Sequence, residues 1–194
     1  MAKFTRTEER LRSLIEEQKV FFVGTAAPYG RVNIAPKGME TLRVMAPNRI
    51  VWLNLTGAEN ETAAHLAESP RMTIMWCSFA TKPMILRVYG NASMVHPRDD
   101  AWDELAALFP PMPGARQILD LDVNFVLTSC GFGVPLFEFV GERDTLRRWA
   151  QQKGEEGLRK HWAECNQLSI DGKPTGIFGD ETSIDSSTGD HAIL

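Results

Sequence analysis

The feature that most constrains the fold is a series of apolar, β-branched segments separated by very short turns. Segments 20–26 and 31–36 flank Pro28-Tyr29-Gly30, and segments 39–45 and 50–55 flank Pro47-Asn48-Arg49. Turns of this length can join only antiparallel neighbours, because a parallel pair needs a crossover of a dozen residues or more. The pattern therefore predicts two β-hairpins in the first third of the chain.

Three further strands and one internal helix extend this sheet. We expect strands at 71–79, 84–95 and 118–130, the last with apolar residues at every second position. The one long connection, from Thr56 to Pro70, predicts a short helix at 60–68. The fold class is therefore mainly β with helices (α+β): a closed or nearly closed antiparallel β-barrel with helices at its ends and on one side.

Further helices are predicted on either side of this barrel. Thr5-Arg6-Thr7-Glu8 has a capping-box pattern and predicts a helix to about Lys19. Segments 96–109 and 144–163 also have helical features, and Gly154 should break the second. From Asp171 onward Gly, Pro, Ser, Thr and Asp dominate. We expect one domain over residues 1–170, followed by a loop or loosely held tail over 171–194.

Charge and composition exclude several classes of partner. The formal net charge is −4 and no basic stripe is present, which argues against nucleic acid and anionic membranes. No apolar run approaches the roughly 20 residues of a membrane span, and the charged start is unlike a signal peptide. The three cysteines are far apart, which argues against a disulfide framework and predicts a cytoplasmic protein. The four histidines lack ligand spacing, so no metal site is expected.

The turn that opens the predicted 60–68 helix is a candidate phosphate site. A helix N-terminus leaves backbone N–H groups unpaired and carries a partial positive charge. Thr56, Asn60 and Thr62 add hydroxyl and amide donors. Ordinary helix capping is the alternative, since Asn60 is a good N-cap residue. Glu59 and Glu61 favour that alternative, because their carboxylates complement the helix dipole themselves and repel phosphate.

Two cations in predicted strands are candidates for the same anion. Lys37 ends a strand on which Asn33 and Ala35 share its face, although a solvated rim position is the alternative. Arg87 lies in an otherwise apolar strand, where it either faces outward or presents a guanidinium fork to an anionic ligand. Cys130 adjoins two glycines, and its sequence context does not assign it a role.

In this order, the segments resemble the pyridoxamine 5'-phosphate oxidase-like family of the FMN-binding split-barrel superfamily. The resemblance covers roughly residues 21–95 and rests on Val32-Asn33-Ile34-Ala35-Pro36-Lys37-Gly38, Asn54-Leu55-Thr56-Gly57, Asn60-Glu61-Thr62-Ala63-Ala64-His65-Leu66 and Ile85-Leu86-Arg87-Val88-Tyr89-Gly90. Segments 129–135 and 166–172 resemble signatures of one subgroup. The resemblance implies a six-stranded Greek-key split barrel that forms a homodimer, with FMN at the subunit interface.

The resemblance also implies which residues hold the FMN phosphate. They are the Lys that ends the second strand, here Lys37, and the residues that open the helix, here Asn60, Glu61 and Thr62. Vitamin B6 enzymes carry a Ser-Arg-Lys-type cluster at that helix start, so two cations are replaced here by a neutral polar residue and an acid. This weakens phosphate binding unless Arg87 or a cation of the partner chain compensates. The chain also lacks the C-terminal segment with which those enzymes close over pyridoxal phosphate, which argues against that substrate.

The sequence therefore predicts an FMN-binding flavoprotein, an FMN-dependent oxidoreductase whose substrate and catalytic residues it does not identify. A non-catalytic protein that stores or senses flavin or haem on the same fold is the alternative, and deazaflavin is a third cofactor class. The predicted cofactor contacts are the side chains of Lys37, Asn60, Thr62 and Arg87, with backbone donors from Thr56, Gly57 and Glu61.

Overall fold

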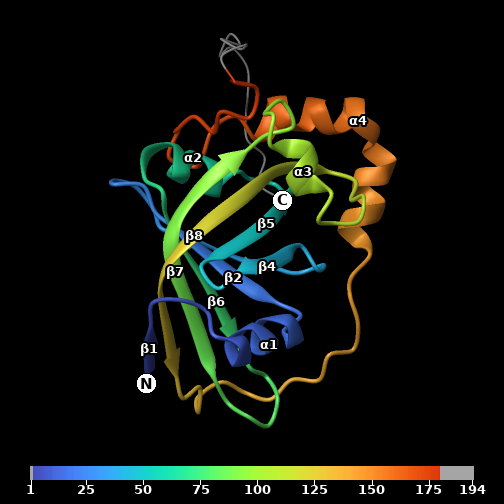
Figure 1. Ribbon diagram of the computed structural model, residues 1–194. Coiled ribbons are helices and arrows are strands. Elements are labelled where there is room, and N and C mark those ends of the chain that lie inside the picture. The colour runs from blue at the N-terminus through green and yellow to red at the C-terminus, as the bar shows by residue number, and fades with distance from the viewer. Residues whose placement is uncertain (1, 180–194) are drawn as a thin grey trace.

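The computed structural model describes residues 2–179, and its centre is one curled antiparallel sheet (Figure 1). Neighbouring strands pair in the order β3-β2-β6-β7-β8-β5-β4, and β1 pairs with β8 outside this path. The strands are β1 (Ala2–Phe4), β2 (Phe21–Thr25), β3 (Asn33–Lys37), β4 (Leu42–Ala46), β5 (Arg49–Leu55), β6 (Arg71–Cys77), β7 (Ile85–Val95) and β8 (Ala115–Ser129).

The predicted split barrel is confirmed, with eight strands in place of six. β3 and β4 stand at the two ends of the strand order, so the barrel is split between them. β8 is long enough to have two different partners along the edge away from β7. β5 pairs with its first half, and β1 pairs with Val126 to Thr128 in its second half. This second half of β8 is therefore free to accept the short N-terminal strand.

Two apolar cores lie on opposite faces of β5. The main core fills the barrel beneath the helix α1 (Glu9–Glu17), and Phe21 packs there against Trp52 and Trp76 at ring-centre distances of 6.2 Å. A smaller core lies on the other face, between β5, β8 and the helix α3 (Trp102–Ala106). Because both faces of β5 are covered, its apolar residues run consecutively from Ile50 to Leu53 instead of alternating with polar ones.

The helices differ from expectation mainly at their ends. α1 begins after Glu8, so the capping box predicted from Thr5 does not open it, and Glu8 makes no side-chain cap. The backbone N–H of Thr7 donates to the Pro47 carbonyl. α3 is shorter than the predicted 96–109 helix and is flanked by turns. The internal helix α2 (Glu61–Glu68) occurs as expected. α4 (Thr145–Cys165) is interrupted at Gly154, where φ is 64°, and the predicted break is confirmed.

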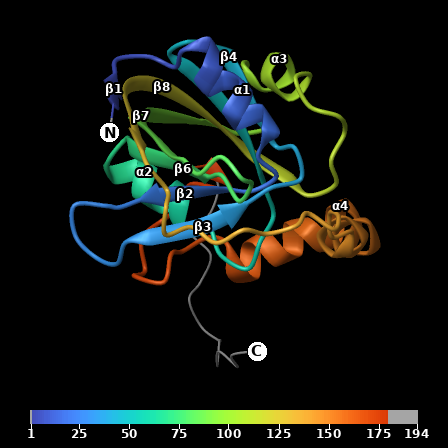
Figure 2. The ribbon, with the colours of Figure 1, turned by 90° about the horizontal axis from the view of Figure 1, so that it is seen from below.

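The chain returns from α4 to the barrel through a loop that we call the C-terminal strap, residues 166–179. Seen from below in Figure 2, α4 lies outside the barrel, and an extended segment, residues 130–144, leads to it from β8. The strap then passes beside α2 (Figure 1). The remainder of the predicted tail, 180–194, lies outside the described residues. Over residues 2–179, no helix is long and apolar enough to cross a membrane.

Candidate functional site

Lys37 lies at one end of the barrel with its amine against an aromatic ring. Its strand alternates, so that Asn33, Ala35 and Lys37 are half-buried while the residues between them are exposed. Lys37 pairs with Phe21 of the core. Its Nζ stands 5.4 Å from the centre of the Trp52 ring. The strand alternation therefore directs Lys37 inward, as its spacing from Asn33 predicts.

The Lys37 amine has no acidic side chain as a partner. None of the ion pairs found among residues 2–179 involves it. Burial, and to a smaller extent the nearby positive charge of Arg116, lowers the pKa of this amine to about 8. A half-buried ammonium with no carboxylate beside it favours an anionic ligand.

Arg116 is the second cation of this site, and sequence reasoning missed it. It is 3% exposed, and it lies at the β5–β8 bulge opposite Asn54 and Leu55. Its Nη1 donates to Asn166 Oδ1 at 2.6 Å and its Nη2 to the Glu59 carbonyl at 2.8 Å. Nε has no partner within the described residues, and burial lowers the pKa of the guanidinium to about 10. At neutral pH Arg116 is therefore a buried positive charge without a counter-ion.

β5 connects the surroundings of the two cations. Trp52, beneath the Lys37 amine, and Asn54 follow each other on one face of the strand. Asn54 Nδ2 donates to Gln117 Oε1 at 3.2 Å, and Gln117 is the immediate neighbour of Arg116. Gln117 also lies 3.4 Å from His96 Nε2. Two buried amides that bond to each other, Asn54 and Gln117, thus lie on the two strands that carry Trp52 and Arg116.

Asn60, at the start of α2, supplies an unpaired amide. It is 1% exposed, and both its Oδ1 and its Nδ2 lack a partner within residues 2–179. It is the N-cap residue of α2 by position but makes no side-chain cap. A buried amide without partners costs about 1–3 kcal/mol unless a ligand satisfies it. The capping role considered from the sequence therefore does not account for this side chain.

Thr56 and Gly57 hold the turn against α4. Thr56 Oγ1 donates to the Gly114 carbonyl and accepts from Trp162 Nε1, each at 2.8 Å. The Gly57 carbonyl accepts from Asn166 Nδ2 at 3.3 Å. The Thr56 N–H, predicted as a backbone donor to the ligand, instead donates to the Gly114 carbonyl at 2.7 Å. The Thr56 hydroxyl and the Gly57 carbonyl likewise have structural partners from distant parts of the chain.

Glu61 and Thr62 are likewise bonded to other segments. Glu61 Oε1 accepts from the Ile170 N–H of the strap at 2.7 Å, and Oε2 lies 4.0 Å from His65 Nε2. Thr62 Oγ1 accepts from Asn33 Nδ2 at 3.2 Å and so fastens α2 to β3. The Glu61 carboxylate, which fits a phosphate site least well, is therefore engaged by the strap.

The structure does not bring Arg87 into this group. Its neighbours Leu86 and Val88 are fully buried in the core, so Arg87 projects from the opposite face of the sheet. There its Nη1 donates to Ser129 Oγ at 3.3 Å. Arg87 and Lys37 consequently lie on different faces within one chain.

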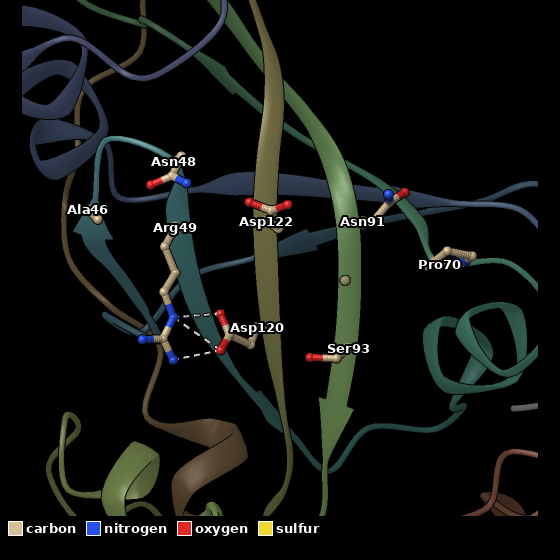
Figure 3. Close-up of a pocket in the computed structure, with 9 residues that line it drawn as sticks. Ala46, Asn48, Arg49, Pro70, Asn91, Ser93, Asp120 and Asp122 are labelled. Atoms are coloured by element: carbon tan, nitrogen blue, oxygen red, sulfur yellow. Dashed lines mark hydrogen bonds and ion pairs between the residues drawn. The ribbon is translucent and has the colours of Figure 1, made fainter.

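A pocket of about 530 Å³ lies elsewhere, against β4, β5, β7 and β8 (Figure 3). Arg49 forms a fork with Asp120, with nitrogen–oxygen distances of 2.7–3.1 Å, and Asp122 adds a second carboxylate. With two carboxylates and one guanidinium that is already paired, this pocket has the wrong charge for phosphate. Over residues 2–179, no group of three or more His, Cys, Asp or Glu could hold a metal ion.

The fold and these groups can be compared with known proteins. The family model for pyridoxamine 5'-phosphate oxidase matches residues 7–130, which include Lys37, Asn60 and Arg116. The chain belongs to this family. The match ends before α4 and the strap, so two partners of the site, Trp162 and Asn166, lie outside the matched range.

Individual relatives agree with this assignment. The family protein ustO of Aspergillus flavus is 31% identical over 184 residues, which cover 86% of this chain and 74% of that protein. Among solved structures, a protein provisionally named pyridoxamine 5'-phosphate oxidase from Lactobacillus delbrueckii superposes with a TM-score of 0.53 at 18% identity. The superposed part covers 66% of this chain and 99% of the Lactobacillus protein.

HupZ of Group A Streptococcus has the same TM-score, 0.53, at 14% identity, and covers 63% of this chain and 94% of its own. At these identities the two solved structures support the shared fold alone.

Proposed function

We propose that this chain is a split-barrel flavoprotein that holds the phosphate of FMN between Lys37, Arg116 and Asn60. The observation that carries the proposal is an uncompensated positive charge and an unpaired amide, both buried at the end of the barrel where α2 begins. A phosphate dianion would neutralise the charge and satisfy the amide. Charge-assisted hydrogen bonds of this kind are stronger than neutral ones.

The residues present fit this group. Arg116 Nε and Asn60 Nδ2 are donors without partners within the described residues, and Lys37 carries an ammonium without a counter-ion. The N-terminus of α2 adds a partial positive charge. The Glu61 carboxylate opposes an anion, but it accepts a bond from the strap, which disperses part of its charge. Arg116 thus takes the place of the cations missing from the helix start.

When bound, FMN supplies hydride or electron transfer, and the protein supplies orientation and charge. The activity that follows is that of an FMN-dependent oxidoreductase on a small molecule. Lys37 and Arg116 hold the phosphate end, while the buried amides of Asn54 and Gln117 keep the adjoining wall polar. A cytoplasmic location, inferred from the cysteines, remains part of this proposal.

The proposal includes a homodimer. Phe22, Met75, Arg87, Tyr89 and Phe125 project from the outer face of the sheet, away from the core. They are half-buried in one chain, and the Tyr89 and Phe125 rings pack at 5.8 Å. A second copy on this face would bury them, and Arg87 would then face the partner. This accounts for a cation on an otherwise apolar strand.

A comparison of two flavins in two proteins tests the phosphate site. FMN and riboflavin differ only in the phosphate, so we titrate both by fluorescence quenching into the wild type and Lys37→Met. We expect Lys37→Met to weaken FMN about tenfold or more, equivalent to about 1.4 kcal/mol, and to leave riboflavin unchanged. Lys82→Met, which removes an exposed lysine outside the site, is the matched control.

Equal weakening of both flavins would contradict the phosphate assignment. If the wild type quenches neither flavin, the flavoprotein proposal fails. An absorbance band near 400 nm in the purified protein, where about 450 nm is expected for flavin, would instead favour the haem-binding alternative.

A further inference from the structure

The Lys37 amine differs from an ordinary surface lysine in three ways. It lies against the Trp52 ring, has no carboxylate partner within residues 2–179, and is close enough to Arg116 to feel that charge. The chain has seven lysines. Lys160 and Lys173 are paired with glutamates, and Lys82 is exposed on a turn. Burial and the charge of Arg116 disfavour the protonated form of Lys37, whereas the face of the Trp52 ring attracts the ammonium.

These surroundings give the amine nucleophilic character. A pKa of about 8 leaves about one amine in ten unprotonated at pH 7, against roughly one in three thousand for an ordinary lysine. Desolvation and a neighbouring cation are the two means by which enzymes activate lysine toward carbonyl groups. Lys37 has both.

The polar groups near Lys37 indicate which class of substrate its amine would react with. Arg116 Nε and Asn60 Nδ2 have no partner within the described residues, and both are buried. They favour a substrate with a compact anionic group, and the isolated charge of Arg116 favours phosphate in particular. We propose that Lys37 is a nucleophilic lysine that forms an imine with a phosphorylated aldehyde, whose phosphate lies on Arg116 and Asn60.

The reaction needs no other reagent. The lone pair of neutral Lys37 Nζ attacks the aldehyde carbon, and the C=O π electrons move to oxygen to give a carbinolamine. Both hydrogens of the amine leave with that oxygen as water, and a C=N bond replaces the C=O bond. No electrons are exchanged with a redox partner. The imine and FMN would use the same anion-binding groups, so each excludes the other.

Pyridoxal 5'-phosphate is a suitable probe, because its imine absorbs visible light and borohydride reduces it to a stable secondary amine. The full-length protein, free of flavin absorbance, is incubated with the probe, reduced and mapped by peptide mass spectrometry. We expect Lys37 to be modified at least tenfold faster than Lys82, with half-maximal rate near pH 8. We also expect pyridoxal, which lacks the phosphate, to modify Lys37 at least tenfold more slowly.

Three variants complete the design. Lys37→Arg keeps a positive charge at the site but cannot form an imine, so it should lose the visible band even if Lys37→Met fails to fold. Asn60→Ala should slow modification by the phosphorylated probe more than by pyridoxal. Lys82→Met should leave modification of Lys37 unchanged.

The inference is overturned if Lys37 reacts no faster than Lys82, or if the two probes react equally well. It stands or falls separately from the proposed function. Modification of Lys37 in a protein that binds no FMN would refute the flavoprotein and keep the nucleophilic lysine. FMN binding without modification would do the reverse.

Discussion

Two arginines along the same pair of strands illustrate how differently one side chain can be used. Arg49 and Arg116 lie at opposite ends of the β5–β8 pairing. Arg49 lines the open pocket of Figure 3 and is 44% exposed, and its fork with Asp120 raises the pKa of its guanidinium. Arg116 is buried without a carboxylate, and burial lowers its pKa. The guanidinium in the pocket of Figure 3 is thus paired with a carboxylate, whereas the guanidinium of Arg116 is not.

This difference indicates at which arginine an anionic ligand would gain more binding free energy. An anion that meets Arg49 must displace Asp120 and tolerate Asp122. One that meets Arg116 displaces no carboxylate. The proposed anion site is therefore chosen by uncompensated charge and not by the size of a pocket.

Exchanging each arginine for methionine tests the contrast most directly. We expect Arg116→Met to weaken FMN binding about 10- to 150-fold, since a buried charged hydrogen bond contributes roughly 1.5–3 kcal/mol. Arg49→Met should change it less than twofold. Flavin fluorescence titration measures both, and circular dichroism verifies that each variant is folded. Similar losses in the two variants would abolish the distinction between the two regions.

The anchor of Arg116 can be removed while the arginine stays. Asn166 accepts from Arg116 and donates to the Gly57 and Ala58 carbonyls. We expect Asn166→Ala to lower the free energy of unfolding by about 2–3 kcal/mol, because it leaves buried polar groups unpaired. Urea denaturation gives the value. Asn48→Ala, in the pocket of Figure 3, is the control and should cost less than about 0.5 kcal/mol. A loss at Asn166 no larger than this would show that the turn holds without its anchor.

The lowered pKa of the Lys37 amine should change how the free energy of unfolding depends on pH. Its pKa is about 8 when folded and about 10.4 when unfolded, so between these values the unfolded chain binds more protons and stability rises with pH. We expect the wild type to gain on the order of 1 kcal/mol relative to Lys37→Met across this range, after allowance for solvent screening. Parallel stability curves for the two proteins would exclude a depressed pKa.

We expect the smallest change in stability from the ion pair between Arg49 and Asp120. Asp120→Asn removes the carboxylate that faces Arg49, and an exposed ion pair contributes only about 0.5–1 kcal/mol. Thermal unfolding should register a fall of this size, and FMN affinity should not change. An improved FMN affinity in this variant would mean that freeing Arg49 creates a second anion site.

The local parts of the fold and site were predictable from sequence. Short turns identified the antiparallel sheet, and the Thr56–Pro70 connection located α2 correctly. The inward face shared by Asn33 and Lys37 follows from strand alternation alone. Such features depend on residues a few positions apart, which is the range over which sequence patterns are informative.

The missed parts depend on distant segments. Arg116 was overlooked because the strand was predicted to begin at 118, whereas β8 begins at Ala115. Glu61 seemed to repel phosphate, but its partner, the Ile170 N–H, lies 109 residues further along the chain. Arg87 was grouped with Lys37 as a cation, although Leu86 and Val88 beside it indicate the opposite face of the sheet. Only tertiary packing determines the first two.

The attachment of Arg116 to Asn166 also has a consequence for synthesis on the ribosome. Lys37, Asn60 and Arg116 all emerge before α4, yet the guanidinium has its Nη1 partner only once residue 166 is available. The Glu61 carboxylate has its backbone partner only after residue 170 has been synthesised. A nascent chain can therefore form the strands of its barrel before the proposed anion site is complete, so binding at that site should be among the last events in its maturation.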